Sequence, residues 1–97
     1  MRVKIIRSPN SKKKFRAILE DGRTVDFGAS GYSDYTKHKN PSRMRLYVTR
    51  HGGGKENWGM SGIATAGFWS RWYLWSQPTI QGAKSFMSKK FGIKFTH

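Results

Sequence analysis

The chain has 97 residues, enough for one domain but not for two, and 14% of them are aromatic, as in a folded protein and unlike a disordered basic tail. Nineteen lysines and arginines stand against five acidic residues, and the resulting net charge of +14 favours a polyanionic or strongly acidic partner. The sequence has no cysteine, which excludes disulfides and thiolate metal sites, and no apolar run long enough to span a bilayer.

The first third of the chain predicts strands. Val3–Arg7 is a short stretch that favours a strand. Apolar and polar residues alternate in Lys14–Leu19, as expected of a strand with one buried face, and Thr24–Phe27 is its predicted partner. Between them, Asp21 and Gly22 favour a primed two-residue turn, because such turns need positive φ. We therefore expect an N-terminal hairpin.

Two helices are predicted next. Ser33 is expected to cap a short helix, with Asp34 in its first turn, where a negative charge is favourable. The second helix has clearer ends. Asn40 suits its N-cap, Pro41 its first helical position and Gly52 its C-terminal stop.

The most aromatic stretch, GFWSRWYLW, is predicted to lie in a central helix over Ala66–Trp75. Phe68, Trp72 and Trp75 recur at helical spacing, and a second aromatic stripe lies beside them. A helix that is apolar on two faces belongs in the core of a domain.

The residues around this helix support the same picture. Thr65 is a good cap for its first turn. Arg71 can lie across an indole face, in a cation–π contact, or reach the surface with its stem buried. A further helix is predicted over Pro78–Phe91, with Gly92 as its stop. Ile93–Phe95 can then form a last strand beside the hairpin.

We therefore expect a single basic α+β domain over residues 1–97. Its N-terminal β-hairpin, or a three-stranded sheet, is packed by three to four short helices, with the aromatic helix at the centre. The chain contains no internal repeat and no linker long enough to divide it.

The acidic residues give little support for catalysis. The five carboxylates are scattered, whereas metal-dependent nucleases need several that converge. Asp34 and His38 form the one close acid–base pair, at i and i+4, and this spacing more often gives a surface contact on a helix than a catalytic dyad. The histidines lack metal-ligand spacing, and no phosphate-binding loop is present. We expect no enzyme activity, no catalytic residue, no metal site and no cofactor.

The basic residues gather in three clusters with few acids between them, a pattern that favours contacts to phosphates. Such contacts position a protein on nucleic acid without reading its sequence. The candidate nucleic-acid-binding residues are Lys12, Lys13, Lys14 and Arg16 in the first cluster, Lys37, Lys39, Arg43, Arg45 and Arg50 in the second, and Lys84, Lys89 and Lys90, followed by Lys94, in the third.

Three blocks of the sequence, TVDFGASGYSDYTKHK, ENWG and TAGFWSRWYLW, resemble a family of small basic uncharacterised proteins of nucleocytoplasmic large DNA viruses, including algal and iridovirus-like lineages. The resemblance runs from about Lys14 to Phe91. It implies a viral origin and a role in the virion or in DNA packaging, and it carries over no catalytic residue. The stretch HGGGKENWG holds more glycine than the family pattern.

Charge and resemblance together predict a non-enzymatic, virion-associated basic protein that binds nucleic acid, DNA first, through the phosphate backbone during genome packaging or organisation. It is expected in the virion, and in the host cytoplasm or nucleus during assembly. The alternative is a minor capsid protein that bridges or cements larger capsid subunits through their acidic surfaces. One continuous basic face suits a duplex, whereas basic patches separated by exposed aromatic residues suit protein contacts. The sequence leaves DNA or RNA, sequence preference and oligomeric state open.

Overall fold

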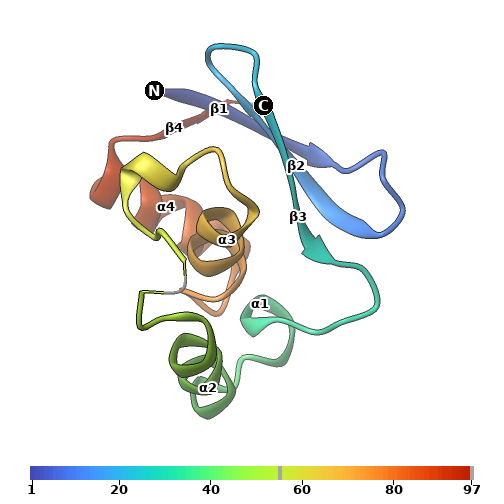
Figure 1. Ribbon diagram of the computed structural model, residues 1–97, viewed down its shortest axis with the longest axis vertical. Coiled ribbons are helices and arrows are strands. Elements are labelled where there is room, and N and C mark those ends of the chain that lie inside the picture. The colour runs from blue at the N-terminus through green and yellow to red at the C-terminus, as the bar shows by residue number, and fades with distance from the viewer. Residues whose placement is uncertain (55, 97) are drawn as a thin grey trace.

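The framework of the computed structural model is one four-stranded sheet (Figure 1). Strand β1 (Arg2–Arg7) pairs antiparallel with β2 (Lys13–Leu19), which pairs antiparallel with β3 (Thr24–Ala29). Strand β4 (Lys94–Thr96) pairs in parallel with the other edge of β1, so the strand order is β3-β2-β1-β4. The predicted hairpin and the predicted last strand are therefore confirmed.

The turn between β2 and β3 differs from the predicted one. The amide of Gly22 donates to the carbonyl of Leu19 at 2.9 Å, and the amide of Leu19 donates to the carbonyl of Arg23 at 2.8 Å. Gly22 has a φ of +91°, but Asp21 does not have a positive φ. The primed two-residue turn is therefore wrong, because both primed turns need a positive φ at their first central residue, which would be Asp21.

The helices pack on one face of the sheet, and α2 lies at the opposite end of the molecule from β1 and β4 (Figure 1). Two helices follow the hairpin, and the aromatic segment is divided into a short α-helix and a π-helical turn. In chain order the elements are α1 (Tyr35–His38), α2 (Pro41–His51), the 3-10 turn η1 (Met60–Gly62), α3 (Ala66–Trp69), the π-helical η2 (Ser70–Leu74) and α4 (Ile80–Phe91). The predicted α+β fold is confirmed.

The predicted aromatic helix is central, but its pitch changes. Thr65 caps it by accepting the amide of Phe68 at 3.4 Å, and α3 then makes a single turn. From Ser70 the backbone continues as a π-helix. The uniform α-helix predicted over Ala66–Trp75 is therefore wrong in its second half. A π turn takes in one residue more than an α turn, so the side chains that follow are rotated from their α-helical positions.

The aromatic rings of this segment differ in burial. Trp69 and Tyr73 are 0% and 2% exposed, whereas Trp72 and Trp75, which the helical spacing placed on the core stripe, are partly buried. Trp69 packs against Phe27 of β3 with ring centroids 5.8 Å apart. The core is therefore centred on Trp69 rather than on Trp72.

The cation–π contact predicted for Arg71 is confirmed. Its guanidinium carbon lies 4.6 Å from the centre of the Trp72 ring and 5.4 Å from that of Trp58. Its Nη1 also donates to the carbonyl of Trp75 at 2.6 Å. These contacts hold this arginine within the fold.

The ends of α2 are as predicted. The side chain of Asn40 accepts the amides of Ser42 and Arg43 at 3.0 and 3.3 Å, Pro41 is the first helical residue, and Gly52 is the C-cap. The sequence therefore places this basic helix correctly.

Two other caps differ from the prediction. Asp34, not Ser33, caps α1, because its carboxylate accepts the amide two residues further on at 2.9 Å. Helix α4 begins at Ile80 with Thr79 as its cap, so the predicted start at Pro78 is two residues early.

The structure describes residues 1–54 and 56–96. Within these ranges no helix combines the length and the apolar character that crossing a bilayer requires.

Candidate nucleic-acid interface and adjoining cavity

Two acidic residues are bound to members of the first predicted cluster. Lys14 Nζ lies 2.6 Å from Asp34 Oδ2, and the two side chains are 12% and 2% exposed. Arg16 donates to both carboxylate oxygens of Asp26 at 2.7 and 3.0 Å, and these hydrogen bonds hold the pKa of Asp26 below its usual value. Lys14 and Arg16 therefore contribute to the fold. Asp34 is buried against Lys14, so it is not the surface partner of His38 that the spacing indicated.

A hollow of about 500 Å3 joins the first and second predicted clusters. We call it the sheet-end hollow, since it is lined by the ends of β1 and β2, the segment after β3, and α1. Sequence analysis did not single out Arg7, although it falls on the same face of β1 as the apolar Val3 and Ile5, where a charge is out of pattern. The basic residues that line this hollow are Arg7, Lys13, Lys14 and Lys37.

Helix α2 presents most of the second cluster. None of its residues is buried, and none is acidic. Arg43, Arg45 and Arg50 are exposed, and Leu46 between them is 53% exposed. A smaller hollow of about 150 Å3, which we call the helix hollow, is lined by Arg43, Leu46, Tyr47, Arg50, His51 and Trp75.

A series of aromatic rings, the aromatic column, attaches α2 to the rest of the domain. The rings of Tyr47 and Trp75 are parallel, 2° apart in plane with centroids 4.5 Å apart, and Tyr47 also stacks on His51 at 4.4 Å. Trp58 lies 6.4 Å from Tyr47, and His38 lies 5.3 Å from Trp75. Side-chain stacking therefore takes the place of the buried face that a peripheral helix usually has.

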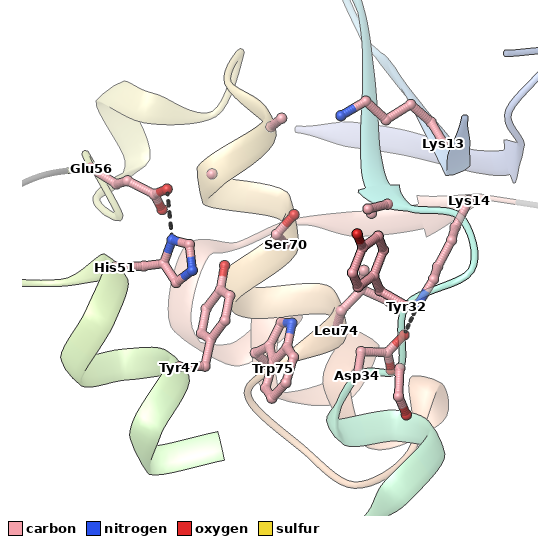
Figure 2. Close-up of a pocket in the computed structure, with 15 residues that line it drawn as sticks. Lys13, Lys14, Tyr32, Asp34, Tyr47, His51, Glu56, Ser70, Leu74 and Trp75 are labelled. Carbon is pink, nitrogen blue, oxygen red and sulfur yellow. Dashed lines mark hydrogen bonds and ion pairs between the residues drawn. The ribbon is translucent and has the colours of Figure 1, made fainter. Parts of the chain in front are cut away.

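Figure 2 shows the central cavity, which has a volume of about 380 Å3. Residues from the ends of β2 and β3, from α2, and from α3 and η2 line it. His51, Tyr47 and Ser70 carry polar atoms on one side of the cavity, and Lys14 lies on the other (Figure 2). Tyr32 also lines the cavity and is 74% exposed, so its ring stands at the mouth.

Glu56 supplies a carboxylate to this cavity. It accepts the indole Nε1 of Trp58 at 2.8 Å, and its other oxygen lies 3.5 Å from His51 Nδ1. Burial, followed by the charge of Glu56, raises the pKa of Tyr47, so its phenol stays a neutral donor. A Cβ at Gly67 would lie 2.8 Å from the Glu56 carboxylate, so only glycine lets the carboxylate sit against α3. This end of the cavity therefore offers both donors and acceptors.

The three hollows lie side by side, because neighbouring ones share walls. The central cavity shares with the sheet-end hollow Lys13, Lys14 and Asp34. It shares with the helix hollow Tyr47, His51 and Trp75. The buried ion pair and the aromatic column thus divide one surface that has basic ends and an aromatic, polar centre.

The third predicted cluster belongs to a different surface. Lys84 of α4 and Lys94 of β4 line a separate hollow of about 620 Å3. Lys84 Nζ lies 5.8 Å from the centre of the Phe95 ring, and Lys90 Nζ lies 5.3 Å from that of Trp72. Within the described part of the chain, these lysines and Lys89 line none of the three connected hollows.

The two remaining candidates have different surroundings. Lys12 is exposed in the connection between β1 and β2. Lys39 has a left-handed φ of 55° at the end of α1, and its Nζ donates to the carbonyl of Pro78 at 2.5 Å. Lys39 therefore ties the link between α1 and α2 to the segment before α4.

His38 supports the start of α2. Its Nδ1 accepts the amide of Asn40, the N-cap of α2, at 3.0 Å. Its Nε2 is buried and has no hydrogen-bond partner among the described residues. Burial lowers the pKa of His38, and the charge of Arg43 lowers it further against the opposing charge of Asp34. The neutral imidazole is thus the form that this site holds.

Residues 1–54 and 56–96 contain no group of three or more histidines and carboxylates placed to hold a metal ion. The histidine at position 97 lies outside the described residues.

Together these features define a small α+β domain in which a basic helix and a basic sheet end flank an aromatic cavity. The chain belongs to a family of unknown function (DUF5754), whose profile matches residues 3–51, from β1 to the end of α2. No curated protein and no solved structure matches the chain significantly.

Proposed function

We propose that this chain is a non-enzymatic protein that binds nucleic acid through the phosphate backbone. The observation that carries the proposal is the basic surface running from the sheet-end hollow, past α1, to the exposed arginines of α2. Its proposed phosphate contacts are Arg7, Lys13, Lys37, Arg43, Arg45 and Arg50.

The placement of the acids supports this function. Asp34 and Asp26 are bound to Lys14 and Arg16, and α2 carries no acidic residue. Among the described residues that line the three connected hollows, Glu56 is the other carboxylate, so cations outnumber acids on this surface. A concentration of one sign of charge attracts a polyanion and speeds its association.

The proposed setting is the virion of a large DNA virus, where the protein would organise or package the genome. This part of the proposal rests on the resemblance of the three sequence blocks to small basic proteins of nucleocytoplasmic large DNA viruses. The proposed localisation is the virion, with the host cytoplasm or nucleus during assembly.

A salt titration with two matched variants tests the proposal. Arg43→Glu/Arg45→Glu/Arg50→Glu reverses three charges on α2, and Lys89→Glu/Lys90→Glu/Lys94→Glu makes the same change in net charge on the separate third surface. For a 20-base-pair duplex, loss of three phosphate contacts should lower the slope of log K against log salt by about 2.7. The α2 variant should lose about 100-fold in affinity at 150 mM salt, for all sequences alike. Equal losses in the two variants, or no measurable binding by the parent at 150 mM, would refute it.

Leu46 supports a second candidate function, that of a minor capsid protein. Its apolar side chain is 53% exposed in the helix hollow between Arg43 and Arg50, which suits an acidic protein surface with an apolar centre. This function predicts salt-resistant association with a large acidic subunit. Leu46→Ala should weaken that association and leave duplex binding unchanged, and co-purification with empty shells of the particle would measure it.

A further inference from the structure

We infer that the central cavity receives one unstacked base of a single-stranded nucleic acid, while the neighbouring phosphates lie on the two basic hollows. This inference rests on the proposed function and extends it, since a backbone interface alone needs no cavity. It names a ligand class, single-stranded DNA or RNA, and a site for one base.

The order of the three hollows is the first support. The cavity lies between the sheet-end hollow, with Arg7, Lys13 and Lys37, and the helix hollow, with Arg43 and Arg50. A strand that crosses all three would meet cations before and after the cavity. Proteins that bind single strands combine such a cationic track with aromatic surfaces for the bases.

The lining of the cavity is the second support, because its end beside α2, across the cavity from Lys13 and Lys14, suits a base better than a phosphate (Figure 2). The carboxylate of Glu56 would repel a phosphate, whereas it can accept from the amino group of a base. The phenol of Tyr47 and the hydroxyl of Ser70 add further hydrogen-bonding groups (Figure 2). A cavity of about 380 Å3 is within the size range of sites for small ligands.

Tyr32 is the third support. It follows Gly31, which has a φ of +85°, and its ring is 74% exposed at the edge of the cavity. A large aromatic ring left in water costs free energy that a stacked base would recover. Base stacking requires a free ring face, and the rings of Tyr47 and Trp75 already stack on each other. The stacking residue is therefore Tyr32, and the edges of the aromatic column form the wall.

The test compares matched ligands and variants by fluorescence anisotropy at 100 mM salt. The ligands are 12-nucleotide single strands, oligo(dC), oligo(dT) and oligo(rC), and a duplex of mixed sequence. The variants are Tyr32→Ala, Tyr32→Phe, and Ser70→Leu, which fills part of the cavity. The control is Met60→Ala, which removes another exposed apolar side chain away from the cavity lining. A thermal melt of each variant confirms that it is folded.

Tyr32→Ala and Ser70→Leu should each weaken binding of single strands about tenfold or more, as loss of a base–aromatic stack does. Duplex binding should change less than twofold, and Tyr32→Phe and Met60→Ala should match the parent. Oligo(dC) should bind more tightly than oligo(dT), because only cytosine has an amino group for Glu56, and Glu56→Gln should reduce that difference. Oligo(rC) shows whether the site tolerates the 2′-hydroxyl of RNA.

This design distinguishes failure of the base site from failure of the proposed function. If the α2 charge-reversal variant weakens both single strands and duplex, but Tyr32→Ala and Ser70→Leu bind single strands like the parent, the base site is wrong and the backbone interface stands. If the parent binds neither ligand, the proposed function fails and the inference fails with it.

Discussion

The aromatic segment of α3 and η2 and the basic helix α2 contain the same kinds of residue and use them in opposite ways. In the first, Trp69 and Tyr73 are buried and Arg71 is held over an indole with its Nη1 on a backbone carbonyl. In α2, no residue is buried and the arginines face solvent. An arginine near aromatic rings is therefore held within the fold where protein packs on several sides of it, and exposed where protein packs on one side.

The largest expected effect is a loss of stability in the buried aromatic segment of α3 and η2. Trp69→Ala should lower the free energy of unfolding by about 3–5 kcal/mol, because it removes a fully buried ring and leaves a cavity. Trp72→Ala should cost less, since Trp72 is only partly buried. Urea unfolding measures both, with Met60→Ala as a control that should stay within about 0.5 kcal/mol of the parent. Equal losses for the two tryptophans would mean that Trp69 contributes no more to the core than Trp72.

The next effect concerns the buried ion pair that divides the sheet-end hollow from the central cavity. Lys14→Met should cost about 3 kcal/mol, because it leaves the Asp34 carboxylate buried without its cation. Lys12→Met is the matched control at an exposed lysine two residues away, and it should be nearly neutral. If the two variants unfold alike, Lys14 is an interface residue, as the sequence first indicated, rather than part of the fold.

Residues whose role depends on near neighbours in sequence were predictable, and these account for most of the fold. The start of α2 at Asn40 and Pro41 was predictable because these residues act within one helical turn. The buried face of β2 was predictable because apolar and polar residues alternate along the strand. The start at Ser33 failed for a similar local reason, since Asp34 beside it is an equally good cap.

The candidate site was harder to predict because its parts are distant in sequence. Asp34 meets Lys14 twenty residues away, and Tyr47 stacks on Trp75 from another element. No local pattern encodes such pairs. The π-helical turn that begins at Ser70 was not predicted either, since the spacing of its residues fits an α-helix equally well.

A smaller effect tests how α2 is attached. Tyr47→Ala removes the stacked ring that joins this helix to Trp75, and it should destabilise the docking of α2 by about 2 kcal/mol. Amide hydrogen exchange should then be faster in α2 and unchanged in β2, because opening is local. Tyr47→Phe keeps the ring and should retain protection. Uniformly faster exchange across the sheet would show that α2 and the core unfold as one unit.

The smallest effect is a pH dependence at the start of α2. Because the pKa of His38 is lowered in the fold, its contribution to stability is complete above about pH 6.5, the pKa of a free histidine, and is lost as the pH falls below that value. A protonated Nδ1 can no longer accept the amide of Asn40, so the first turn of α2 should lose exchange protection in acid. His38→Asn, whose amide oxygen can accept at all pH values, should abolish the dependence. Identical pH profiles in parent and variant would exclude His38 as its source.

The parallel pairing of β1 with β4 bears on how the chain reaches this structure. Arg2 pairs with Lys94 in the sheet, so the second edge of β1 is covered only after β4, some ninety residues further along the chain, has been synthesised. Such a long-range contact slows folding, because the entropy of closing a large loop is lost before the pairing contributes favourable free energy. During synthesis the hairpin partner β2 covers one edge of β1 early, while the other edge stays open to pairing with another chain. The positive charges of Arg2, Lys4 and Arg7 on that strand would then keep nascent copies of this protein apart until β4 arrives.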